Sequence, residues 1–206
     1  SSLTVSGWTL ISRISGFIRD LVLANKLGTS FTSDAFFIAL MLPNLLRRLF
    51  AEGAFNVAFV PLYMAEREKN PKKAQQFINT TLTWLILVLI IITILAEIFM
   101  PALVMLLAPG FLENAEKFDL TVFFARITFP YLMLISLTSY LGALNNSVGK
   151  FMGFAMIPVI LNITLIAALI THPFLNLSPA LAATLAIPTT GILQLLTMVY
   201  FFKKVG

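Results

Sequence analysis

The sequence has no cysteine and only one histidine, His172, and only 11% of its 206 residues are charged. The missing cysteines exclude disulfides and thiolate metal sites, and a single histidine excludes a catalytic histidine cluster. A soluble domain of this length keeps about a quarter of its residues charged. The scarcity of charge argues against a soluble enzyme, and we predict no catalytic residue, no metal site and no cofactor.

Hydrophobic residues make up 59% of the chain, and its mean hydropathy is +0.94. One folded core of this length could not cover so much apolar surface, so we infer that lipid surrounds the chain. Apolar segments of about 20 residues are long enough to cross a bilayer as helices. The sequence therefore predicts an all-α polytopic membrane protein with six transmembrane helices, at about residues 3–27, 33–65, 76–108, 118–145, 151–171 and 179–202.

Prolines recur inside five of these six predicted spans. They are Pro43, Pro61, Pro101, Pro130, Pro158 and Pro188. Because proline lacks the backbone N–H and tends to kink a helix, we expect several of the spans to bend.

Basic residues are unevenly divided between the predicted loops. Seven of them belong to one side of the membrane: Arg67, Lys69, Lys72, Lys73, Lys150, Lys203 and Lys204. The alternate loops offer only Lys26 and Lys117. Since cytoplasmic loops carry the excess of Lys and Arg, we predict that the N-terminus and the C-terminal end are cytoplasmic. Clustering at segment ends also argues against a nucleic-acid partner, despite the net charge of +5.

Two predicted spans carry polar stripes. At 100° per residue, one face of the first span collects Ser6, Thr9, Arg13, Gly16 and Asp20, with Arg19 beside it. In the second span a polar residue recurs every four positions, at Asn44, Arg48, Glu52 and Asn56, with Arg47 on the flank. A charge facing lipid costs at least ~2.5–3.5 kcal/mol, so both stripes should face a shared interior.

The charges in these stripes do not balance. Four arginines (Arg13, Arg19, Arg47 and Arg48) accompany two carboxylates, Asp20 and Glu52, so two positive charges remain. Surplus guanidinium in a cavity indicates an anionic ligand, and the planar fork of arginine grips phosphate oxygens in pairs. We predict a pyrophosphate site formed by the four arginines.

A structural reading of the same charges stays open. Arg13–Asp20 and Arg48–Glu52 could be ion pairs that only fix helix packing, and arginines near helix ends could reach the head groups. Asp34 could cap its helix instead of facing the cavity. Glu97 and Arg126 each stand alone in a predicted span, and packing and function are equally good readings of them.

Several stretches carry a resemblance to one known family. They are residues 12–20 (SRISGFIRD), 34–37 (DAFF), 43–55 (PNLLRRLFAEGAF), 58–61 (AFVP), 108–111 (APGF) and 127–131 (ITFPY). With these motifs the chain resembles the MurJ (MviN) family of bacterial lipid II flippases, in the multidrug/oligosaccharidyl-lipid/polysaccharide exporter superfamily. The run at 43–55 is far more specific than shared hydrophobicity would produce.

The resemblance implies a two-lobe exporter of the bacterial inner membrane, of which residues 1–206 form the N-terminal six-helix lobe. Its partners would be the C-terminal lobe, membrane lipids and lipid II, moved by alternating access. Arg13, Arg19 and Arg47 match arginines that bind the pyrophosphate, and Asp20, Asp34 and Glu52 match acidic positions of the family. The family's further arginine and cation site belong to the second lobe. The chain starts at Ser1 and stops after an apolar span, so we expect a longer protein.

Three other functions remain as alternatives. A related exporter could carry other polyprenyl-linked sugars or drugs, although a cation exporter would need an acidic cavity. A membrane enzyme acting on polyprenyl phosphates would need a metal motif or a nucleophile–base pair, which the loops lack. A structural or regulatory membrane subunit would be favoured if the charged residues proved dispensable.

Overall fold

The computed structural model describes residues 2–47 and 54–203, with side chains placed for residues 6–47 and 58–203. Within these ranges all regular structure is helical. The elements are α1 (Ser2–Leu27), α2 (Phe31–Arg47), α3 (Ala54–Lys69), α4 (Pro71–Ile98), α5 (Met100–Leu107), η2 (Pro109–Glu113), α6 (Ala115–Thr128), α7 (Tyr131–Ser147), α8 (Met152–Thr171), η3 (His172–Leu175) and α9 (Pro179–Lys203).

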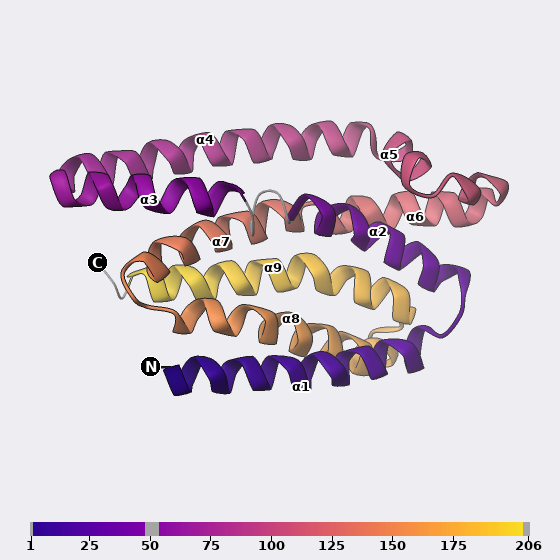
Figure 1. Cartoon of the computed structure of the whole chain (residues 1–206). Coiled ribbons are helices and arrows are strands. Elements are labelled where there is room, and N and C mark those ends of the chain that lie inside the picture. Colours follow the sequence, from indigo (N-terminus) through magenta and orange to yellow (C-terminus); the bar gives the residue numbers. More distant parts are fainter. Residues whose placement is uncertain (1, 48–53, 204–206) are drawn as a thin grey trace.

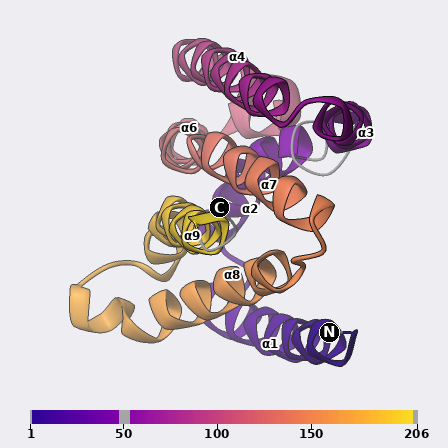
Figure 2. The ribbon, with the colours of Figure 1, turned by 90° about the vertical axis from the view of Figure 1, so that its left-hand side faces the viewer.

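The long helices lie side by side along one common direction, with both termini at the same end of the bundle (Figure 1). α8 packs between α1 and α9, and α9 packs on α7. α2 packs on α6, and the α3–α4 pair lies beyond them on the side opposite α1 (Figure 2). α1 and α4 are therefore the outermost helices of the bundle.

The chain's capping residues set the helix ends. Asn70 accepts hydrogen bonds from the backbone N–H groups of Lys72 and Lys73 and starts α4, with Pro71 in the first turn. Asn114 caps α6 in the same way through the N–H of Lys117. Gly28, at φ +59°, ends α1 in the left-handed conformation that glycine adopts at no steric cost.

Small residues let α9 sit at the centre. Ala182, Ala183 and Ala186 are buried, and an added Cβ at Gly191 would lie 2.9 Å from Leu134 Cβ and from the Tyr131 ring. Such close approach is typical of helix interfaces within membranes. The side chain of Thr128 ties α6 to α2 by donating to the carbonyl of Ala39, at 3.0 Å.

Four described segments are long and apolar enough to cross a membrane: Pro71–Ile98, Ala115–Ser147, Met152–Leu175 and Pro179–Lys203. The prediction of an all-α membrane protein is thus confirmed, but the count of six transmembrane helices is not. α1 is long enough, with 26 residues, but is not among these four segments.

Two of the predicted spans are divided in the structure: the span at 76–108 falls on α4 and α5, and the span at 118–145 on α6 and α7. The span at 33–65 includes α2 and α3, and residues 48–53 between them lie outside the described residues. Pro101 stands at the start of α5 and Pro130 directly before α7, where the missing backbone N–H interrupts the helix ladder. Two of the expected proline bends are therefore helix breaks.

Candidate functional site

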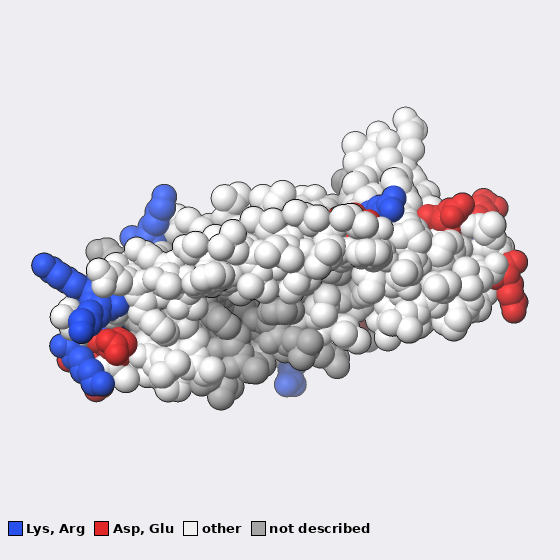
Figure 3. All heavy atoms as spheres, turned by 90° about the horizontal axis from the view of Figure 1, so that it is seen from above, with Lys and Arg blue, Asp and Glu red and all other residues white. Residues whose placement is uncertain are grey.

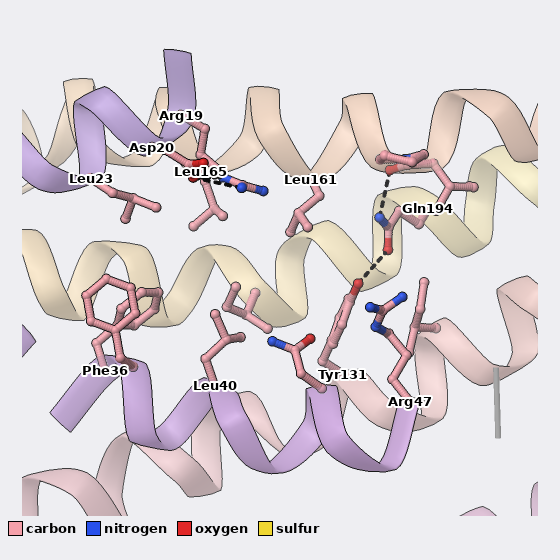
Figure 4. Close-up of a pocket in the computed structure, with 16 residues that line it drawn as sticks. Arg19, Asp20, Leu23, Phe36, Leu40, Arg47, Tyr131, Leu161, Leu165 and Gln194 are labelled. Carbon is pink, nitrogen blue, oxygen red and sulfur yellow. Dashed lines mark hydrogen bonds and ion pairs between the residues drawn. The ribbon is translucent and has the colours of Figure 1, made fainter. Parts of the chain in front are cut away.

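A cavity of about 550 Å³ opens between α1, α2, α7, α8 and α9 (Figure 4). Its polar lining comes mainly from two helices: Arg19 and Asp20 from α1, and Asn44 and Arg47 from α2. Most of the remaining wall is apolar. Two positive charges and one negative charge therefore face a mostly apolar space.

Both cavity arginines point inward. Figure 4 shows Arg19 reaching into the cavity from α1 and Arg47 reaching in from α2. They are 28 positions apart in the sequence, and the turn at Gly28 brings their helices to the same cavity. Guanidinium stays charged when desolvated, so this arrangement favours an anion with several oxygen acceptors.

Arg19 is held by two neighbours. Its Nε and Nη2 donate to Asp20 Oδ1 at 2.9 and 2.7 Å, and its Nη1 donates to Asn162 Oδ1 of α8 at 2.8 Å. The side chain of Arg19 is 25% exposed and that of Asp20 is 64% exposed. Asp20 is thus the acidic partner of Arg19, and the alternative pairing of Asp20 with Arg13 does not form.

Arg13 does not line this cavity. It borders a neighbouring space of about 440 Å³, together with Thr9, Asn146 and Phe154. A shallow groove along α1 and α8 has both Arg13 and Arg19 in its wall. The polar stripe predicted on α1 is therefore spread over connected surfaces, and only its C-terminal part reaches the cavity.

Asp34 lies outside the cavity lining as well. It accepts a hydrogen bond from Lys117 Nζ of α6 at 2.6 Å, and the same ammonium lies 4.0 Å from the centre of the Phe111 ring. The hydroxyl of Ser30, not Asp34, accepts the N–H of Ser33 at the start of α2. In the structure Asp34 thus forms an ion pair between α2 and α6, while its role as a cavity acid stays a prediction.

Three other predicted residues cannot be placed in the site. Arg48 and Glu52 lie outside the described residues, and for Asn56 the structure describes only the backbone in α3.

Glu97 of α4 and Arg126 of α6 lie away from the cavity, within electrostatic reach of each other. One carboxylate oxygen of Glu97 is buried with no hydrogen-bond partner in the described part of the chain.

The structure adds three polar residues that the sequence reading missed. Tyr131 of α7 donates to Gln194 Oε1 of α9 at 3.3 Å, and Gln194 Nε2 donates to the carbonyl of Ile157 at 2.8 Å (Figure 4). Asn162 of α8 is the third. Asn162 and Gln194 each lie in a predicted span without charged residues, and a lone amide in such a span was the sequence feature that could have identified them. Among the described residues no cluster of three metal-ligating side chains occurs.

Comparison with known proteins gives consistent matches. The family model described as "Lipid II flippase MurJ" matches residues 23–206. A "Probable lipid II flippase MurJ" of Rhizobium tropici is 43% identical over 209 residues, covering 99% of this chain and 39% of that protein. The "Lipid II flippase MurJ" of Burkholderia cenocepacia is 38% identical, covering 98% of this chain and 40% of that protein.

A solved structure matches the fold as well. It is titled "Lipid II flippase MurJ, inward closed conformation", and it aligns with a TM-score of 0.83 at 30% identity. The alignment covers 97% of this chain and 41% of the other. The chain thus spans about two fifths of the length of the proteins it matches.

Proposed function

Because the chain belongs to the lipid II flippase MurJ family, we propose that it forms one lobe of a lipid II flippase of the bacterial inner membrane. In this role the protein moves the lipid-linked peptidoglycan precursor from the cytoplasmic to the periplasmic leaflet. The observation that carries the proposal is the match of almost the whole chain to a flippase structure at a TM-score of 0.83. The rest of the transporter, a second lobe, would face the cavity.

The cavity arginines bind the pyrophosphate of the substrate in this proposal. Arg19 and Arg47 project into one space from different helices, and a diphosphate offers oxygen acceptors to both. The apolar walls strengthen the attraction, because charges interact more strongly away from water. Arg13 would meet the head group in the adjoining groove, while roles for Arg48, Glu52 and Asn56 rest on the sequence alone.

Transport would proceed by alternating access. The head group enters from the cytoplasmic side, the polyprenyl tail stays in lipid, and the two lobes rock to expose the cavity to the periplasm. The lining supports loading, since its net positive charge attracts the pyrophosphate more than a neutral site would. It also supports release, since Asp20 offsets part of that positive charge. Membrane lipids would cover the outer helices.

The charge distribution supports an orientation. Lys and Arg gather at one end of the bundle, and Asp and Glu gather mostly at the other (Figure 3). The basic end holds the α3–α4 turn and both termini (Figure 1). By the excess of positive charge on cytoplasmic loops, this end faces the cytoplasm. Six passes would follow if α2–α3, α4–α5 and α6–α7 each cross once.

The test uses the full-length protein in cells depleted of their own lipid II flippase. The measurement is the fraction of lipid II that an externally added, membrane-impermeant reagent can modify. We expect the protein to restore external lipid II and growth, and an empty vector to restore neither. Lipid II that stays internal, despite normal levels of the protein in the membrane, would refute the assignment.

A further inference from the structure

Asn162 stands in the middle of α8, where it is 3% exposed. The two threonines of α8 bond within their own helix: Thr164 donates to the carbonyl of Ile160 and Thr171 to that of Ala167, both at 2.8 Å. Asn162 differs, because every hydrogen bond of its side chain goes to α1. Its amide is therefore a link between two helices and not a local helix contact.

The amide group of Asn162 uses both of its ends. Nδ2 donates to the carbonyl of Ser12 at 3.1 Å and to Ser15 Oγ at 2.9 Å, and Oδ1 accepts from Arg19 Nη1 at 2.8 Å. A guanidinium can only donate, so the atom that faces Arg19 has to be the oxygen. This contact fixes the orientation of the amide and leaves neither donor of Nδ2 unused.

The same contacts account for the donors of Arg19. A guanidinium has five N–H groups. Asp20 takes two of them and Asn162 takes one, so two remain for a ligand in the cavity. Both residues hold the side chain at a definite place on the cavity wall, but only Asp20 neutralises it. Asn162 holds Arg19 without adding a second negative charge beside it.

We infer that Asn162 is a positioning residue for Arg19. It holds Arg19 from α8 by a neutral contact, so that the guanidinium can donate hydrogen bonds to a phosphate oxygen of the substrate. The inference rests on the proposed function, since it assumes an anionic lipid head group in the cavity. It explains why an uncharged amide stands here: a second carboxylate beside Asp20 would hold Arg19 equally well but would make this part of the cavity wall net negative.

The experiment measures binding of purified lipid II to the full-length protein in detergent, together with the melting temperature of each variant. Asn162→Leu removes the acceptor, and we expect about tenfold weaker binding. Asn162→Asp keeps an acceptor for Arg19 and adds a negative charge, so we expect still weaker binding. Thr164→Val is the matched control on the same helix, and its affinity should equal that of the parent.

A double-mutant cycle separates positioning from packing. If Asn162 acts through Arg19, then adding Asn162→Leu to Arg19→Ala causes no further loss of binding, whereas independent roles would add. Parent-like binding by Asn162→Leu, or additive losses, would overturn the inference alone. If Asn162→Leu does not fold, parent-like binding by Asn162→Asp has the same meaning. A parent protein that does not bind lipid II overturns the proposed function and this inference together.

Discussion

α1 and α4 are both long outer helices with many exposed apolar side chains, but their polar groups find partners in different places. In α4 the hydroxyls of Thr81, Thr83 and Thr93 all donate to carbonyls four residues earlier in the same helix. In α1 the side chain of Arg19 and the backbone of Ser12 bond to α8. Hydroxyls that bond within their own helix leave its surface free to face lipid, whereas the Arg19 side chain of α1 needs a neighbouring helix.

This difference indicates that α1 takes part in the proposed function, whereas α4 supports the structure. The substrate-facing charges of the proposed flippase lie on α1 and α2, and α4 contributes no residue to the cavity lining. The one charge inside the apolar part of α4, Glu97, lies near its C-terminal end and away from the cavity. We therefore expect substitutions to act on transport near α1 and only on stability near α4.

The strongest test of the comparison replaces arginines inside and outside the cavity by alanine. Arg19→Ala and Arg47→Ala in the full-length protein should lower external lipid II at least ~10-fold, because each removes a charged hydrogen-bond donor from the cavity. The measurement is the same labelling of external lipid II in depleted cells. Arg126→Ala is the matched control, since this arginine is exposed on α6 outside the cavity.

Equal loss of transport in Arg126→Ala would break the comparison, because α6, which has no residue in the cavity lining, would then share in the transport. Normal transport by both cavity variants would make Arg19 and Arg47 packing residues. Both conclusions require membrane levels of each variant equal to those of the parent, measured on the same cells.

Two glycines mark the difference between the closely packed interior of the bundle and the open surface of α1. An added Cβ at Gly191 of α9 would lie 2.9 Å from Leu134 Cβ, whereas at Gly7 of α1 nothing lies within 4 Å. We expect Gly191→Ala to destabilise the protein by ~1–3 kcal/mol through overpacking. Gly7→Ala should stabilise it by ~0.5–1 kcal/mol, because glycine inside a helix costs entropy. Melting temperatures in detergent test both, and equal shifts would contradict the packing described.

The sequence predicted the uninterrupted, charge-free spans well. Residues 151–171 and 179–202 correspond closely to α8 and α9, because length and apolarity alone determine such helices. The breaks at Pro101 and Pro130 were expected only as bends, since proline permits either and the packing of neighbours decides.

The cavity was predictable in part. The stripes identified Arg19, Asp20, Asn44 and Arg47, and these four line the cavity, although their role as ligands stays a prediction. Arg13 is six residues from Arg19, about 9 Å along the helix, so it borders the adjoining groove and not the cavity. Asn162 and Gln194 were missed, because a single amide in an apolar helix gives no periodic pattern and its partners lie in other helices.

A smaller effect is expected where the cavity helix α2 meets α6. Asp34→Asn removes the ion pair with Lys117. Because the side chain of Asp34 is 57% exposed, we expect the free energy of unfolding to fall by at most ~1 kcal/mol. Melting in low and high salt tests this, because salt should weaken the parent and leave the variant unchanged. Loss of transport as complete as in Arg19→Ala would instead return Asp34 to the acidic positions implied by the family resemblance.

The smallest effect is expected in α4 itself. Thr93→Val removes a hydroxyl that donates to the carbonyl of Leu89 at 2.7 Å, a carbonyl that also belongs to the backbone ladder of α4. Nothing outside the helix loses a partner, so the stability change should stay within ~0.5 kcal/mol and transport should not change. Asn162→Leu is the counterpart on α8, where the lost partner belongs to α1. If both variants lowered transport equally at equal membrane levels, partner location would not separate functional from supporting helices, and the contrast between α1 and α4 would fail.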